Sequence, residues 1–197
     1  MRPRSKALSW RVAPRATTRG EGDGYIGSIP IDAEIDKLTN SIENVRTGEV
    51  FDTAVMRLAA NDRRLKKKDW RFNWKLEFAE RGREVHALTT VADASIIQGL
   101  ISVEDKGDHV FVHLVENARF NQGREKVYQG VAPNLFAFAC QRAIDLGYAG
   151  AVSFVSKTAL KAHYAHTLGA TILYGDAMAI GTKQAQALVD RYFTDRA

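Results

Sequence analysis

The sequence predicts an α+β fold with one central sheet. Three observations favour this fold. Three strands joined by short turns fill residues 84–116, and apolar helices alternate with short strands after them. The chain has 197 residues, 45% of them hydrophobic and 26% charged, which suits one domain with its own core. It has one cysteine, Cys140, which excludes an internal disulfide and a multi-cysteine zinc site.

The positive charge of the chain is concentrated at its N-terminus. Residues 1–20 carry six basic side chains and no acid, whereas the rest of the chain carries 22 basic and 23 acidic ones. We therefore predict a basic flexible tail and linker over residues 1–30 and a folded domain over residues 31–197. Such a tail is typical of a solvated extension, attracts nucleic acid or an anionic surface, and is also compatible with an organelle transit peptide.

No run of apolar residues approaches the roughly 18 needed to span a bilayer, and the first 30 residues have no continuous apolar core. We therefore expect a cytoplasmic domain without a membrane partner.

The first part of the domain predicts a hairpin and then a helix. Residues 38–46 and 50–56 flank the turn Thr47-Gly48-Glu49 and are expected to be strands. Residues 57–82 are expected to be helical, because Trp70, Trp74 and Phe78 are spaced by four. This stripe indicates core packing, and the basic run 63–68 beside it indicates an exposed helix face or, alternatively, a nucleic-acid contact.

The next three strands are expected over residues 84–91, 96–104 and 109–116, with a tight hairpin over residues 105–108 between the last two. Strict alternation in the third strand predicts that alternate side chains share a face. On that basis Val110, Val112, Leu114 and Glu116 point to one side, and Phe111, His113 and Val115 point to the other.

Helices and short strands alternate in the last third of the chain. Helices are expected over residues 133–146, 158–168 and 183–193, with Gly147 and Gly169 ending the first two. Strands are expected over residues 149–155, 171–174 and 177–180, the last two forming a hairpin around Gly175-Asp176.

The loop before the first of these helices has the chemistry of an anion site. Gly130 permits a positive φ, and Pro133 suits the first helical turn. Ala132 has no side-chain oxygen to cap the first amides, so these N–H groups and the helix dipole are available to a phosphate.

The succession of a long strand, this glycine-containing loop, an apolar helix, a short strand and a helix with a tyrosine before Gly169-Ala170 resembles the GNAT superfamily of acyl-CoA-dependent N-acyltransferases. The resemblance covers about residues 84–180, and Gly130-Val131-Ala132 matches the second half of the family's pyrophosphate loop. It implies an α+β fold with a central mixed, mostly antiparallel sheet flanked by helices. It also implies a CoA-binding core over residues 84–180, an atypical acceptor-side region over residues 31–82, and direct transfer of an acetyl or other acyl group from acetyl-CoA to a primary amine.

The resemblance also implies roles for individual residues. Backbone groups of Leu114 and Val115 would hold the pantetheine arm, and Tyr164 would protonate the leaving thiolate. The pyrophosphate would bind the amides of Gly130, Val131 and Ala132, with Asn134 as the next donor. No metal is expected, because His109 and His113 lie about 13 Å apart along a strand.

Deprotonation of the amine needs a carboxylate or a histidine near the cleft. Glu116, at the end of the third strand, is the first candidate. His113, one strand step earlier, is the second.

The acceptor, a small-molecule or peptide amine, stays open among a small metabolite, an aminoglycoside-like polyamine, a peptide N-terminus, a lysine side chain and an aminoacyl-tRNA. An alternative function is a degenerate GNAT-like fold that binds a protein or nucleic acid through its basic tail and the 63–71 cluster. It is favoured by three departures from the family pattern: Val127 where Gln or Arg is expected, the long loop 117–129, and Tyr164 five rather than four residues before Gly169. The nearly neutral body argues against a large nucleic-acid footprint there. A homodimer is compatible with either function.

Overall fold

The computed structural model describes residues 41–193, and the tail and linker expected over residues 1–30 lie outside that range. The strands are β1 (Ser41–Asn44), β2 (Val50–Arg57), β3 (Arg83–Thr90), β4 (Ile97–Asp105), β5 (Val110–Asn117), β6 (Tyr128–Gln129), β7 (Val152–Val155), β8 (Thr171–Tyr174) and β9 (Ala177–Ile180). The α-helices are α1 (Trp74–Ala79), α2 (Val131–Asp145), α3 (Lys161–Leu168) and α4 (Thr182–Phe193).

All nine described strands form one sheet in the order β6-β1-β2-β3-β4-β5-β7-β9-β8. Every neighbouring pair is antiparallel except β5 and β7, which run parallel. The fold class predicted from the sequence is therefore confirmed: an α+β fold with a mixed, mostly antiparallel sheet and flanking helices.

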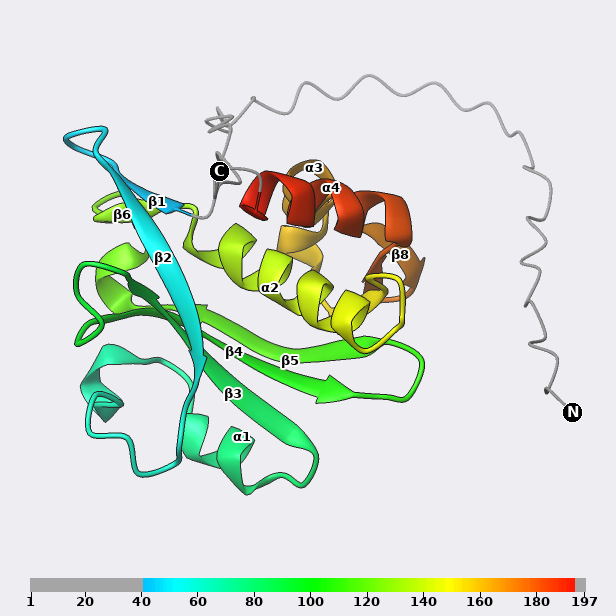
Figure 1. The fold of residues 1–197 in the computed structure, drawn as a ribbon, viewed down its shortest axis with the longest axis horizontal. Coiled ribbons are helices and arrows are strands. Elements are labelled where there is room, and N and C mark those ends of the chain that lie inside the picture. Colours follow the sequence, from blue (N-terminus) through cyan, green and yellow to red (C-terminus); the bar gives the residue numbers. More distant parts are fainter. Residues whose placement is uncertain (1–40, 194–197) are drawn as a thin grey trace, which may run out of the picture. The chain divides into compact units, whose positions relative to one another are not determined.

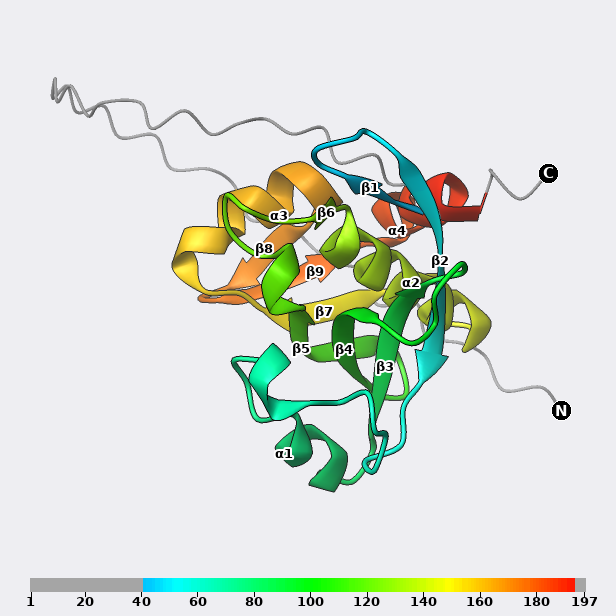
Figure 2. The same ribbon diagram turned by 90° about the vertical axis from the view of Figure 1, so that its left-hand side faces the viewer.

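Helices cover both faces of this sheet (Figure 1). The larger core lies between the sheet and α2 and α4, where Phe136, Leu135 and Leu188 are buried against strand residues. The smaller core lies on the opposite face of the sheet, which α1 covers (Figure 2). There Trp70 and Trp74, the latter at the start of α1, pack against residues of β3 and β4. None of the helices in residues 41–193 is long and apolar enough to cross a membrane.

The prediction of a helix over residues 57–82 is wrong. Only a 3-10 turn, Lys67–Asp69, and the short helix α1 form there. The N–H groups of Arg71 and Phe72 donate to the Glu116 carboxylate, at 2.6 and 3.3 Å, so they are not available for helical bonds. The two tryptophans nevertheless meet edge to face, with ring centroids 6.2 Å apart, so the predicted aromatic cluster exists without the predicted helix.

The strict alternation expected in β5 is also wrong. Ser102 pairs with Leu114 and Val103 pairs with Val112, so His113 is an extra residue in β5. Such a β-bulge turns two successive side chains toward one face. As a result Val112 and Val115 both pack in the larger core, while Leu114 packs in the smaller one.

The other expected elements form with shifts of a few residues at their ends. Gly147 and Gly169 have positive φ values of 85° and 63° and end α2 and α3 as predicted. The segment 171–180 forms the hairpin of β8 and β9. The long loop after β5 contains the short strand β6, which pairs with β1 at the edge of the sheet.

A buried histidine in β3 gives the fold a pH dependence. His86 packs its ring 4.7 Å from that of Phe138, and its Nδ1 has no hydrogen-bond partner among the described residues. Burial lowers the pKa of His86 to about 4. Below its ordinary pKa the unfolded chain binds a proton that the folded chain does not bind, so stability falls as the pH decreases toward 4.

We expect this histidine to remove about 2 kcal/mol from the free energy of unfolding between about pH 7 and about pH 5. Denaturant titrations across that pH range test this prediction. His86→Leu should flatten the profile by that amount, whereas His166→Leu, at an exposed position, should leave it unchanged. Parallel profiles for the wild type and His86→Leu would contradict the prediction.

Candidate functional site

The candidate site is a cavity that opens where β5 and β7 separate. The parallel pairing between these strands ends at Val112 and Phe154, whereas β5 continues to Asn117. The backbone groups on that side of β5 therefore lose their strand partner beyond Val112. The cavity has a volume of about 190 Å³. Its lining residues are Phe72, Val112, His113, Leu114, Val115, Phe136, Phe154, Val155, Ser156, Lys157, Leu160 and Tyr164.

The bulge in β5 places His113 on the wall of this β5–β7 cavity. Its Nε2 lies 2.7 Å from Oε2 of Glu104, which also accepts a hydrogen bond from Lys106 Nζ at 2.7 Å. The Lys106 hydrogen bond, and then that of His113, lower the pKa of Glu104. An ionised carboxylate at Nε2 favours the tautomer that carries its proton there, which leaves Nδ1 as the basic atom of the ring.

Tyr164 reaches the same cavity from α3. Its ring meets the rings of Phe136 and Phe154 edge to face, with centroids 5.5 and 5.3 Å away. Burial raises the pKa of Tyr164, so the phenol keeps its proton at neutral pH. No described residue forms a hydrogen bond with its hydroxyl, which can therefore donate to a ligand in the cavity.

Glu116 lies elsewhere. It is 5% exposed and does not line the cavity. Its Oε1 accepts a hydrogen bond from Arg71 N at 2.6 Å, and its Oε2 accepts bonds from Phe72 N at 3.3 Å and from Trp74 Nε1 at 2.8 Å. The carboxylate thus holds the segment that brings Phe72 to the cavity.

The glycine-containing loop forms the N-terminus of α2. Gly130 is left-handed, with a φ of 87°, and Val131 begins the helix. The N–H groups of Gly130, Val131 and Ala132 donate to no acceptor in the described part of the chain. The Asn134 amide, by contrast, already donates to Gly130 O at 3.1 Å, so Asn134 leaves the expected set of amide donors. None of these four residues lines the β5–β7 cavity.

The first turn of α2 packs directly against Gly99 of β4. A Cβ atom at Gly99 would lie 2.6 Å from Cγ1 of Val131 and 3.1 Å from Cδ1 of Leu135. Only a residue without a side chain permits this approach of helix and strand. Gly99 therefore fixes how close the free amides of α2 come to the end of β5.

The structure thus brings four predicted site residues together around one cavity, namely His113, Leu114, Val115 and Tyr164. Sequence reasoning missed Glu104 as the partner of His113, and it missed Phe72 and Lys157 on the cavity wall. Lys157 follows the carboxyl end of β7, a position that could have indicated it. Phe72 carried no such signal, because its segment was predicted to be a helix.

Comparisons with known proteins give only structural matches. No protein-family model matches the chain, and a search of curated proteins finds no match. A crystal structure of a bacterial toxin is 14% identical, with a TM-score of 0.50 over 71% of this chain and 96% of the toxin chain.

Two further solved structures are similar. An acyl-CoA N-acyltransferase from Pseudomonas aeruginosa is 12% identical over 66% of this chain and 99% of its own, with a TM-score of 0.44. A crystal structure of AtaTR bound with acetyl-CoA is 13% identical over 70% of this chain and 98% of its own, with a TM-score of 0.45. Identities this low bear on the fold alone. The mixed, mostly antiparallel sheet with flanking helices is the one that the sequence resemblance implies, and the chain therefore has a GNAT-like fold.

Proposed function

We propose that the chain transfers an acyl group, acetyl in the first instance, from an acyl-CoA to a primary amine by direct attack in the β5–β7 cavity. One observation carries the proposal. A histidine with a carboxylate partner and a protonated tyrosine line the same cavity, at the point where two parallel strands separate. This is the arrangement that general base and general acid catalysis of one reaction needs.

The residues present fit an acyl-CoA. The backbone groups of β5 at Leu114 and Val115 would bind the pantetheine amides, because they have no strand partner on the cavity side. The amides of Gly130, Val131 and Ala132 would bind the pyrophosphate at the start of α2. When bound, the acyl-CoA supplies a thioester carbonyl that an amine can attack.

Two side chains of this chain would then move the protons. Nδ1 of His113 accepts a proton from the amine nitrogen as the new C–N bond forms, and the Glu104 carboxylate at Nε2 stabilises the resulting imidazolium. The Tyr164 hydroxyl donates its proton to the sulfur as the C–S bond breaks. Both groups then exchange protons with solvent and return to their starting states.

His113 is favoured over Glu116 as the base because of what each side chain contacts. Both Glu116 oxygens already accept hydrogen bonds from residues 71–74, whereas His113 lines the cavity. We assign Glu116 a positioning role on the wall that holds Phe72. The basic tail of the alternative binding role lies outside the described part of the chain, whereas its 63–71 cluster lies within it.

Tyr164→Phe tests the reaction. It keeps the ring packing but removes the acid, so we expect kcat to fall about 100-fold with little change in KM for acetyl-CoA. The measurement is thiol release from acetyl-CoA over a panel of primary amines. Tyr174→Phe, at an exposed tyrosine of β8, is the matched control and should keep wild-type kcat. Unchanged turnover in Tyr164→Phe would show that another group protonates the thiolate.

Gly130→Trp tests the donor site separately. A bulky side chain over the free amides of α2 is expected to weaken acetyl-CoA binding, measured by calorimetry, about 30-fold or more. Gly123→Trp is the control. Gly123 has a similar positive φ of 73°, and a Cβ atom added there would have no other atom of residues 41–193 within 4 Å. Equal affinity in the two variants would remove the α2 amides from the proposal.

A further inference from the structure

A second cavity lies on the face of the sheet that α1 covers. It has a volume of about 250 Å³ and is formed by the connection between β2 and α1, the start of β4 and the turn after β5. Its lining residues are Arg63, Arg64, Lys66, Asp69, Trp70, Ser95, Ile96, Ile97 and Phe120. It shares no lining residue with the β5–β7 cavity.

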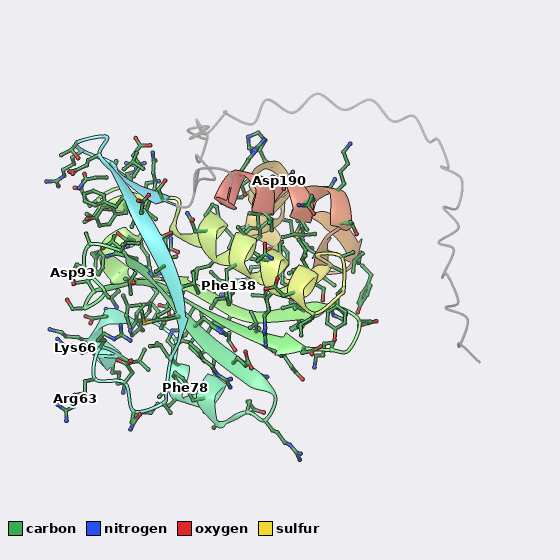
Figure 3. The ribbon with its side chains drawn as sticks, viewed as in Figure 1. Arg63, Lys66, Phe78, Asp93, Phe138 and Asp190 are labelled. Carbon is green, nitrogen blue, oxygen red and sulfur yellow. The ribbon has the colours of Figure 1, made fainter. Side chains whose placement is uncertain are left out.

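The three cations of this cavity are not equivalent. Arg64 is fixed, because its guanidinium donates to both oxygens of Asp62 and, at 2.7 Å, to Ala94 O. Arg63 and Lys66 are exposed, and no acid in residues 41–193 pairs with either of them. Figure 3 shows both side chains projecting on the same side of the β2–α1 connection. The cavity therefore offers two positive charges without an ion-pair partner in the described part of the chain, beside the Arg64 guanidinium that Asp62 and Ala94 hold in place.

The opposite wall is apolar and partly uncovered. Ile96 is 47% exposed and Phe120 is 38% exposed. Trp70 is 4% exposed, yet its indole N–H has no acceptor among the described residues. A ligand with a flat ring would cover the apolar wall, and an anionic group on it would meet the cations.

The cavity also contains an acceptor. The Asp69 carboxylate lines it and forms no hydrogen bond or ion pair through its side chain with a described residue. A bare phosphate would be repelled by this acid, whereas a ligand that also carries hydroxyl or amino donors would satisfy it. The lining thus selects for an anion, a ring and a donor in one molecule.

We propose that this cavity binds one nucleotide unit, with its phosphate on Arg63 and Lys66, its base on Phe120 and Ile96, and a hydroxyl or amino group on Asp69. The volume lies just below the roughly 300–1,000 Å³ that is usual for small-molecule pockets, which limits the occupant to a single unit. The unit is a free nucleotide or one residue of a single strand, and both present the same chemistry. The site does not depend on the acyl transfer proposed above.

The test is calorimetric titration of the full chain with AMP, inorganic phosphate, adenosine and a short single-stranded RNA. AMP should bind about tenfold more tightly than phosphate or adenosine, because each of these lacks one half of the contacts. RNA binding about tenfold tighter than AMP, with a steep salt dependence, would identify a strand as the source. Equal affinities for AMP and the RNA would identify the free nucleotide as the ligand. Absence of binding by both AMP and RNA would overturn the proposal.

Matched double variants separate this cavity from general charge attraction. Arg63→Ala/Lys66→Ala should weaken binding of the tighter ligand about tenfold or more. Lys67→Ala/Lys68→Ala removes the same charge from neighbouring exposed residues that do not line the cavity, and should change affinity by less than about twofold. Equal losses in the two variants would overturn the proposal. Unchanged thermal midpoints of both variants would exclude misfolding.

Discussion

Glu116→Ala is expected to lower the free energy of unfolding by about 4 kcal/mol. The substitution leaves three donors without their acceptor, namely the N–H groups of Arg71 and Phe72 and the indole N–H of Trp74. Because Glu116 is buried, water does not replace the carboxylate without cost. Denaturant unfolding followed by tryptophan fluorescence measures the loss.

Two further variants identify the cause of this loss of stability. Glu116→Gln keeps the shape but turns an NH₂ group toward donors, so we expect a loss of about half that size. Glu125→Ala removes an exposed carboxylate whose ion pair with Arg46 is 3.6 Å long, and should change stability by less than about 0.5 kcal/mol. A loss for Glu116→Ala no larger than that for Glu125→Ala would show that the buried carboxylate does not hold the 71–74 segment.

Gly99→Ala is expected to destabilise the fold by about 3 kcal/mol, at the upper end for overpacked cores. The new Cβ atom would lie 2.6 Å from Val131 Cγ1, and Val131 is buried and β-branched, so it cannot turn away freely. The first turn of α2 must then move away from β4. Thermal or denaturant unfolding measures the effect, and acetyl-CoA affinity should fall with it if the α2 amides bind the pyrophosphate.

The clash itself is tested by compensation. Gly99→Ala/Val131→Ala removes the clashing methyl groups, and the two substitutions should show a favourable coupling of about 2 kcal/mol. Gly181→Ala is the control, because its Cβ atom would lie 3.5 Å from the flexible end of Gln184. Additive effects in the double variant would mean that Val131 is not the group that excludes a side chain at position 99.

The parts of the fold that depend on local chemistry could be predicted from the sequence. The glycines that end α2 and α3 and the turn that joins β8 to β9 act within a few residues, so their signals are visible in the chain. The segment 57–82 could not be predicted in this way. Its aromatic spacing suits a helix, but a carboxylate more than forty positions later takes two of its backbone donors.

The same distinction between local signals and long-range contacts applies to the candidate site. Tyr164 and the end of β5 were found from the order of elements, which the sequence resemblance already contained. The contact between His113 and Glu104 depends on the register of β4 against β5, and that register includes a bulge without a glycine to mark it. No local pattern in residues 110–117 distinguishes a bulged strand from a regular one, so the orientation of His113 required the structure.

The bulge at His113 shifts how the residues of β5 correspond to those of a regular strand in another protein. A relative whose equivalent strand is regular would match residues 110–112 directly, but would match residues 114–117 only after a one-residue gap. Without that gap, each later position of β5 would be compared with a residue from the opposite side of the sheet. Homology searches that penalise gaps inside strands would therefore undervalue this chain's similarity at the very segment that lines its cavity.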